Sequence, residues 1–226
     1  MHGFDLERYA YGLWPAALVS IGIFVFFVLS YLKPKKRWEW QSMGTYTAFV
    51  VALFTEMYGF PLTIYILTSV LGSRYPVLNP FSHINGHLWV ALAGGSTTVW
   101  IIVMVVSNIA MFGGLIIMGK AWGQLHRAGG QLVTTGLYRR VRHPQYSALF
   151  LITVGMLIQW PTLVTAAMWP VLMLMYYRLA RREEREMEAR FGQKYISYKR
   201  RVPMFLPRLA PAQSAAGLKS RVGEFR

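Results

Sequence analysis

The sequence contains no cysteine, which excludes disulfide bonds, thiolate metal sites and catalysis by a thiol. Acidic residues are scarce as well, because 9 Asp and Glu stand against 24 Lys and Arg, and the formal net charge is +15. This charge does not indicate a nucleic-acid partner, since the basic residues stand beside apolar segments and form no separate basic domain. They predict topology signals and contacts with lipid headgroups.

Apolar residues dominate the chain, at 54% hydrophobic against 15% charged. This composition departs from that of soluble domains toward that of integral membrane proteins. A chain of 226 residues supplies about five spans of roughly 20 residues each. We therefore predict an all-α, polytopic integral membrane protein with about five transmembrane helices. It forms one domain over residues 1–207, and a flexible cytoplasmic tail follows at 208–226.

Five apolar segments supply these spans. Glu56, Gly59 and Pro61 interrupt the second segment and predict a kink near its middle. The last two segments are halves of one apolar stretch that breaks at residues 159–162, which predicts a helical hairpin. Because basic residues cluster on one side of the predicted spans, we expect the N-terminus outside and the C-terminus in the cytoplasm. The segments are 11–32, 45–71, 97–118 and, for the hairpin, 147–179.

A polar, amphipathic helix on the cytoplasmic side is predicted over residues 180–201, directly after the hairpin. Glu184 falls at the centre of its apolar stripe, where a carboxylate has to be paired, hydrogen-bonded or bound to a polar ligand. The alternative for the charge run around Glu184 is a solvated, salt-bridged surface. The stripe consists of Met187, Phe191, Tyr195, Tyr198 and Val202.

The candidate partners of Glu184 are Arg142, His143 and Tyr146, which stand where the chain re-enters the bilayer. Pro144 suits the first turn of the hairpin helix, since its missing N–H is not needed there. A hairpin framed in this way returns both polar groups to one side of the membrane, where they can close on a shared ligand. The pattern predicts an enzyme site at this face.

These motifs, in this order, strongly resemble the isoprenylcysteine carboxyl methyltransferase family, which belongs with the phospholipid N-methyltransferases in a wider membrane superfamily. The resemblance implies that S-adenosylmethionine binds at the cytoplasmic face and that a lipophilic small-molecule or lipid-anchored acceptor enters from the bilayer. The glycine-rich loop of soluble methyltransferases is absent. The resemblance covers residues 119–207 and rests on Thr135-Gly136-Leu137-Tyr138, Arg142-His143-Pro144, Tyr146, Glu183-Glu184, Phe191-Gly192, Tyr195, Tyr198 and Val202-Pro203.

Residue roles follow from the resemblance by matching position. Arg190 looks like the arginine that positions the acceptor and is the implied catalytic residue, although its spacing also suits a helical ion pair with Glu186. Residues 119–207 would form the cofactor-binding region, and the divergent residues 1–118 would select the acceptor. Carboxyl O-methylation is the nearest family activity. The implied cofactor-binding residues are Gly136, Leu137, Tyr138, Arg142, His143, Pro144, Tyr146, Glu183 and Glu184.

Other features are open to two interpretations. Glu56 is an ionisable residue inside a predicted span and could line an acceptor cavity with Tyr58, or be paired within the bundle near the kink. We predict no metal site: His83 and His87 are four apart, but Asn-Gly between them favours a turn in an external loop. Gly113-Gly114 predicts close helix packing, and Gly129-Gly130 predicts a turn.

Two rival functions remain from the residues alone. Membrane sterol and enone reductases have a comparable helical C-terminal region but bind NADPH. A non-catalytic membrane sensor or assembly factor on the same fold is the second rival. Binding of S-adenosylmethionine or of NADPH separates the two enzyme classes, and cofactor binding without methyl transfer would favour the sensor.

Overall fold

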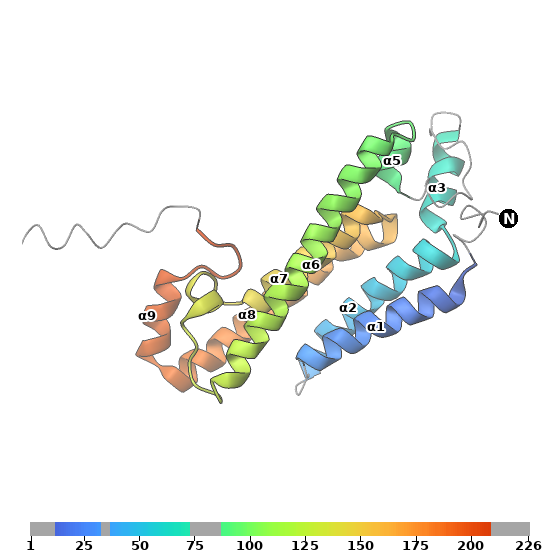
Figure 1. Ribbon diagram of the computed structural model, residues 1–226. Coiled ribbons are helices and arrows are strands. Elements are labelled where there is room, and N and C mark those ends of the chain that lie inside the picture. Colours follow the sequence, from blue (N-terminus) through green and yellow to red (C-terminus); the bar gives the residue numbers. More distant parts are fainter. Residues whose placement is uncertain (1–11, 33–36, 73–86, 209–226) are drawn as a thin grey trace, which may run out of the picture.

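The computed structural model describes residues 12–32, 37–72 and 87–208, and every regular element in these ranges is a helix (Figure 1). The all-α class is therefore confirmed for the described part of the chain. The elements are α1 (Trp14–Leu32), α2 (Arg37–Phe54), the π-helical turn η1 (Thr55–Gly59), α3 (Leu62–Leu71), α5 (Leu88–Leu92), α6 (Thr97–Arg127), the 3₁₀ turn η3 (Gly136–Arg139), α7 (Pro144–Gln159), α8 (Leu163–Phe191) and α9 (Gln193–Arg201).

Helices α6 and α7 approach closely because a glycine lies between them. A β-carbon added to Gly114 of α6 would lie 2.5 Å from Cγ1 of Ile152 and 2.8 Å from a backbone carbonyl oxygen of α7. Small residues that allow such backbone approach are typical of helix pairs in membranes. The predicted packing role is confirmed for Gly114, whereas a β-carbon at Gly113 would meet only Leu151, at an ordinary 3.9 Å.

The predicted kink in the second apolar segment is also confirmed. The chain bends by 71° between Glu39–Gly59 and Leu62–Leu71. At the bend the Glu56 carboxylate is buried, and its Oε2 accepts the Thr63 N–H at 2.8 Å. The Thr63 hydroxyl in turn accepts the Leu163 N–H at 2.8 Å. Glu56 thus satisfies a backbone donor that the break exposes at the start of α3, and links this break to the start of α8.

The hairpin of α7 and α8 forms as predicted, with Pro144 in the first turn of α7 and Thr162 capping α8. The prediction of a separate polar helix from residue 180 is wrong, because α8 continues without a break to Phe191. Arginine, glutamate, leucine and alanine are all good helix formers, so nothing in this stretch stops the helix. It ends instead at Gly192, whose φ is +52°, and α9 follows.

Two described helices, α6 and α8, are long and apolar enough to cross a bilayer, and α2 and α3 add a third if the bent pair is one span. The apolar helices Trp14–Phe27 and α7 are shorter. With 16 residues, α7 is about 24 Å long and does not reach across a hydrocarbon core of about 30 Å. The five predicted spans are therefore not confirmed in number, and the orientation of the termini stays a prediction.

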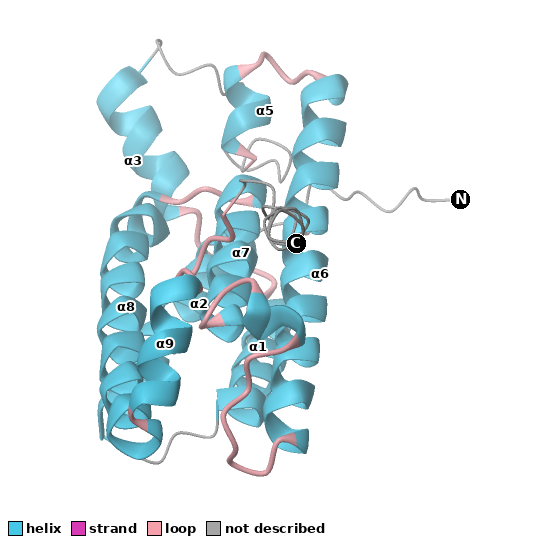
Figure 2. Cartoon of the chain, turned by 90° about the vertical axis from the view of Figure 1, so that its left-hand side faces the viewer, coloured by secondary structure: helices cyan, strands magenta, loops and turns pink. Residues whose placement is uncertain are grey.

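The apolar core lies between the hairpin and the N-terminal helices. Helix α2 packs on α8, and α1 packs on α2. At the polar end of α8, the loop after α6 and helix α9 come together, as Figures 1 and 2 show from two sides. This end of the bundle carries the residues of the predicted site. The largest fully buried core side chains include Tyr46 and Phe49 of α2, Leu149 and Ile152 of α7, and Leu172 and Tyr176 of α8.

Candidate functional site

The loop between α6 and α7 is folded by glycines at positive φ. Gly129 and Gly130 have φ of +55° and +86°, which confirms the predicted turn. At Gly136, φ is +59°, a backbone conformation that favours glycine, and a β-carbon there would lie 1.8 Å from Nε2 of Gln124, so that the amide side chain would have to move. The Gln124 Oε1 accepts the Leu137 N–H at 3.2 Å. Helix α6 thereby holds the turn η3, which places the Tyr138 side chain inward, where it is buried.

The segment after α9 fixes the start of α7 from the other side. The backbone N–H of Arg142 donates to the Pro203 carbonyl at 2.9 Å, and that of His143 donates to the Met204 carbonyl at 3.0 Å. The Ser147 hydroxyl donates to the Phe205 carbonyl at 2.7 Å. Through these bonds the motif before the hairpin and the motif after it, far apart in sequence, form one structural unit.

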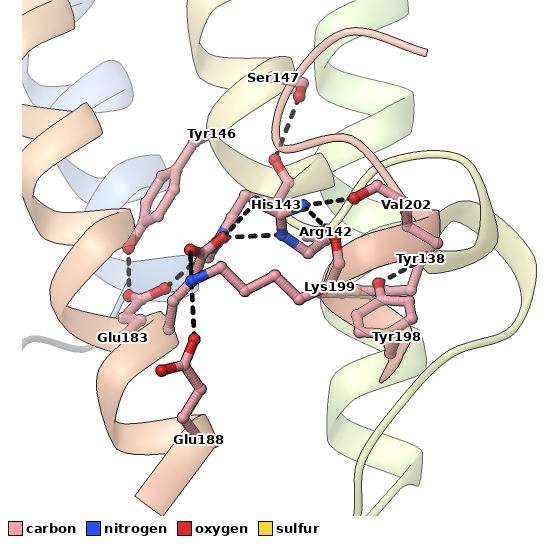
Figure 3. Close-up of polar contacts among 11 residues, drawn as sticks. Tyr138, Arg142, His143, Tyr146, Ser147, Glu183, Glu188, Tyr198, Lys199 and Val202 are labelled. Carbon is pink, nitrogen blue, oxygen red and sulfur yellow. Dashed lines mark hydrogen bonds and ion pairs between the residues drawn. The ribbon is translucent and has the colours of Figure 1, made fainter. Parts of the chain in front are cut away.

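Glu184 is fully buried and is the centre of an ion-pair cluster, which we call the Glu184 cluster. Figure 3 labels the other members of the cluster, Arg142, His143, Glu188 and Lys199. Its Oε1 lies 2.7 Å from both Nε and Nη2 of Arg142. Its Oε2 lies 2.9 Å from Nζ of Lys199, which also contacts Glu188 Oε1 at 2.7 Å. The Arg142 Nη1 donates to the backbone carbonyls of Lys199 and Val202. Burial by itself raises the pKa of Glu184, but hydrogen bonds from His143, Lys199 and Arg142 lower it to about 2. Members of the cluster are Arg142, His143, Glu184, Glu188 and Lys199.

His143 lies between two carboxylates. Its Nε2 is 3.4 Å from Glu184 Oε1, and its Nδ1 is 3.5 Å from Glu183 Oε2. Burial favours neutral imidazole, but hydrogen bonds to Glu183 and Glu184 outweigh it and raise the pKa of His143. Only the imidazolium can donate from both nitrogens at once. The Tyr146 ring stacks on His143 with centroids 5.6 Å apart, and its hydroxyl donates to Glu183 Oε1.

A cavity of about 390 Å³ opens beside these groups, and we call it the main cavity. Its size lies in the range typical of small-molecule sites. Six of the residues predicted for the site line it: Tyr138, Arg142, His143, Tyr146, Glu183 and Arg190. The other lining residues are Leu125, Gly130, Gln131, Leu132, Val133, Gln145, Glu186, Met187, Tyr195 and Tyr198.

Of the two neighbouring carboxylates, Glu183 faces the main cavity and Glu184 does not. The Glu183 side chain is 39% exposed, whereas that of Glu184 is 0% exposed and does not line the cavity. Pro144 is buried in the first turn of α7. Gly136 and Leu137 line a different hollow, on the outer face of η3. The predicted site residues thus lie in three places: in the wall of the main cavity, in the Glu184 cluster, and in the separate hollow on the outer face of η3.

Glu56 and Tyr58 lie away from the main cavity, near the hairpin turn at the opposite end of α7. Glu56 borders a space of about 10 Å³ with Trp160 and Pro161. Tyr58 borders a cavity of about 240 Å³ among α1, α2, η1, α6 and α7, and Gln159 also lines this cavity. The two residues therefore do not share a cavity, and α7, at about 24 Å, separates both of them from His143.

Sequence reasoning did not single out Lys199 and Glu188. Lys199 comes from α9 and closes the Glu184 cluster, and its hydrogen bonds to Glu188 and Glu184 raise its pKa. The only signal in the sequence was a basic residue next to the stripe tyrosine Tyr198, whose hydroxyl donates to the Tyr138 carbonyl at 2.6 Å. The wall formed by Gln131, Leu132 and Val133 carried no recognisable motif.

The described residues contain no group of three or more His, Cys, Asp or Glu placed to hold a metal ion. His87 is buried, and its Nδ1 lies 2.8 Å from the Gln159 carbonyl oxygen, while its ring packs edge-on against Trp160. His83 lies outside the described residues. The main cavity instead combines two carboxylates, Glu183 and Glu186, with a histidine, several tyrosines and two arginines. This set suits a polar, cationic ligand with an aromatic part.

Two curated proteins each match slightly less than half of the chain. Over 112 residues the sequence is 31% identical to the nickel-cobalt-cadmium resistance protein NccN of Alcaligenes xylosoxydans xylosoxydans, a match that covers 48% of this chain and 53% of that protein. Over 100 residues it is 35% identical to the cobalt-zinc-cadmium resistance protein CzcN of Cupriavidus metallidurans, covering 42% of this chain and 46% of that protein. The chain thus spans about half the length of the curated relatives it matches.

The family model of the phospholipid methyltransferases matches residues 86–194, from just before α5 to the start of α9. This range contains the loop that carries Tyr138, the whole hairpin and the carboxylates of α8. The resemblance found in the sequence is therefore confirmed. Together with the apolar helices, the match supports a membrane methyltransferase in general. Residues 86–194 thus match the phospholipid methyltransferase family, which lies within the isoprenylcysteine carboxyl methyltransferase-like superfamily.

Proposed function

We propose that this protein transfers a methyl group from S-adenosylmethionine to a lipophilic or lipid-anchored acceptor at the cytoplasmic membrane face, with carboxyl O-methylation as the nearest activity of the resembled family. One observation carries the proposal: Glu183, Tyr146 and His143 converge on a small-molecule cavity at the polar end of a membrane helix. When bound, the cofactor supplies an activated methyl group on a sulfonium. The protein has to align and desolvate the reactants.

The donor set of the main cavity fits this cofactor. The Glu183 carboxylate is accessible from the main cavity, where it could bind a cationic centre or accept hydrogen bonds from a pair of ribose hydroxyls. Tyr138, Tyr195 and Tyr198 are buried in the cavity wall and offer ring faces to a planar base. His143 and Tyr146 hold Glu183 in place from two sides.

Arg190 stands on the cavity wall one turn after Glu186 and beside the Gly129-Gly130 turn. A β-carbon added to Gly130 would lie 3.2 Å from Arg190 Nη2, so the glycine leaves room for the guanidinium. A guanidinium at this place can hold an anionic acceptor by paired hydrogen bonds. An acceptor carboxylate held there would receive the methyl group that the bound cofactor supplies, and no protein nucleophile would be required.

Calorimetric titration of the detergent-purified full chain with S-adenosylmethionine, S-adenosylhomocysteine and NADPH tests the cofactor class. We expect saturable binding of the first two. Binding of NADPH alone would move the protein to the reductase class. We expect Glu183→Gln to weaken S-adenosylmethionine binding by about 10- to 100-fold, the loss of one hydrogen bond to a charged group. Glu56→Gln, the same change at the far end of α7, serves as the matched control and should leave affinity unchanged.

Transfer itself is tested with tritiated S-adenosylmethionine and an N-acetyl S-prenyl cysteine as the carboxyl acceptor, with a total membrane lipid extract in parallel. A base-labile product identifies a methyl ester. We expect Arg190→Ala to lower kcat/KM for the acceptor by about 100-fold, on the scale of a lost charged pair, while cofactor affinity stays within twofold. Normal turnover with a lower melting temperature would instead assign Arg190 to a structural pair with Glu186. Cofactor binding with no product from either acceptor would favour the non-catalytic alternative.

A further inference from the structure

A second concave surface lies on the outer face of the η3 turn, and it is strongly basic. We call it the basic hollow. It has a volume of about 550 Å³. Its cations come from two elements: Lys120 and Arg127 lie on α6, and Arg139 and Arg140 lie at the end of η3. No carboxylate is among its described lining residues, which are Lys120, Gln124, Arg127, Gly136, Leu137, Arg139 and Arg140.

The concentration of charge in this hollow is not neutralised by the described part of the protein. All four cations are exposed, and none of them forms an ion pair with a described carboxylate. Arg127 folds back along its own helix, where Nε donates to the Gly123 carbonyl at 3.1 Å. The acidic residues of α8 lie in the Glu184 cluster and beside the main cavity instead. Four cations around one concavity repel each other unless an anion joins them.

The shape of the hollow is built by specific contacts. Lys120, Gln124 and Arg127 lie at positions i, i+4 and i+7 of α6, on one face of the helix. Gln124 holds Leu137 through its N–H, and Gly136 admits the amide side chain where any β-carbon would clash. The η3 turn is thereby seated on α6 with Arg139 and Arg140 beside the helical cations. The hollow is thus a fixed feature of the fold and not a chance group of surface side chains.

The position of the basic hollow along α6 indicates which kind of anion it meets. Lys120 is the first charged residue of α6, directly after the apolar part that is able to cross a bilayer. Arg127 follows seven residues later, about 10 Å further along the axis. The headgroup layer on each side of the hydrocarbon core is about 5–8 Å thick. The hollow therefore lies at the level of the lipid phosphates. The phosphate groups at this depth belong to lipid molecules.

We propose that the basic hollow binds the phosphate of an anionic membrane lipid. The arginines offer paired N–H donors that match phosphate oxygens, and Lys120 offers a point charge at the membrane surface. The lipid is bound on one face of η3, while Tyr138 on the other face lines the main cavity. This site is independent of methyl transfer and does not rest on the proposed function.

The test is a calorimetric titration of the detergent-purified full chain with dioctanoyl phosphatidylglycerol, with dioctanoyl phosphatidylcholine and inorganic phosphate as separate titrants. We expect one saturable site for phosphatidylglycerol only. Removing a cation near an anionic lipid weakens binding about fivefold, so Arg139→Gln/Arg140→Gln should weaken it by about 25-fold. Lys120→Gln/Arg127→Gln removes the helical half of the hollow and should have the same effect.

Arg200→Gln/Arg201→Gln in the last turn of α9 is the matched control, because it removes the same charge from exposed arginines outside the hollow. We expect unchanged affinity in this variant, and unchanged helical circular dichroism in all three. Equal weakening by the control would show diffuse attraction and overturn the site. Equal binding of phosphatidylcholine, or binding of inorganic phosphate in place of the lipid, would overturn the assignment to an anionic lipid.

Discussion

The substitution Glu184→Gln removes one charge at the centre of the Glu184 cluster while keeping the size of the side chain. Glu184 is 0% exposed and Arg142 is 10% exposed, so neither charge can turn to water when the other is lost. Breaking a buried pair from one side costs about 3–5 kcal/mol. A fall of the Glu184 pKa from 4.5 to about 2 corresponds, independently, to about 3 kcal/mol in favour of the folded state at neutral pH.

We therefore expect Glu184→Gln to lower the free energy of unfolding by about 3 kcal/mol at pH 7, a fall in melting temperature of roughly 6–12 °C for a chain of this size. The assay is thermal unfolding of the detergent-purified protein, followed by circular dichroism. Because the folded pKa is depressed, this contribution is present above pH 4.5 and is lost as the pH falls toward 2. The variant should therefore lose the corresponding pH dependence.

The matched control is Glu186→Gln, two residues further along the same helix, where the side chain is exposed. We expect a change of less than about 0.5 kcal/mol there. Arg142→Gln should destabilise as strongly as Glu184→Gln, and the double variant should fall well short of the sum, since both remove the same pair. Removal of the Lys199 charge should destabilise the fold less than removal of the Glu184 charge, because the Lys199 side chain is 28% exposed. A melting temperature of Glu184→Gln equal to that of the unchanged protein would refute the role of Glu184 as a buried structural charge.

Two further outcomes follow from single contacts. Gly114→Ala should destabilise the protein by about 1–3 kcal/mol, because its β-carbon would overlap Ile152. Gly113→Ala is the control and should be tolerated. Equal melting temperatures of the two variants would contradict the close approach of α6 and α7. Protonated His143 stabilises the fold fully below pH 6.5, and this contribution is lost as the pH rises through the raised pKa of His143. His143→Gln should therefore flatten the fall in melting temperature above pH 6.5, and His126→Gln on the exposed end of α6 should leave that slope in place.

Local rules in the sequence predicted much of this structure. Pro61 and Gly59 interrupt an apolar run, and the chain bends there by 71°. Glu184 occupies an apolar stripe, and the structure buries it among cations. Both features follow from the free-energy cost of leaving a backbone group or a charge unpaired in apolar surroundings. This cost can be inferred from one continuous segment of the sequence. The orientation of the termini and the roles of individual site residues stay predictions.

Other features depend on contacts between segments, which a single sequence does not reveal. The neighbouring residues Glu183 and Glu184 look alike in sequence, yet one faces the main cavity and the other is enclosed by Arg142 and Lys199. The difference comes from α9, because its residue Lys199 pairs with Glu184 and not with Glu183. The position of α9 depends on the turn at Gly192. The prediction of a helix start at residue 180 failed because composition changes there while helix propensity does not. Glu56 lies at the bend between two helices that form a span only if the bent pair crosses as one, and its distance from the main cavity follows from the direction of α7.

The continuous course of α8 limits the acceptor under the proposed function. The same helix, which is long and apolar enough to cross a bilayer, continues past Leu179 and carries the carboxylate of Glu183 four residues later. Four residues correspond to about 6 Å along the axis, so the main cavity begins at the depth of the headgroups. A rigid helix fixes this depth, whereas two helices joined by a loop would allow it to vary. An acceptor whose tail stays in the bilayer must therefore carry its reactive group within a few bonds of the apolar chain, and a group on a long polar headgroup would extend past Glu183.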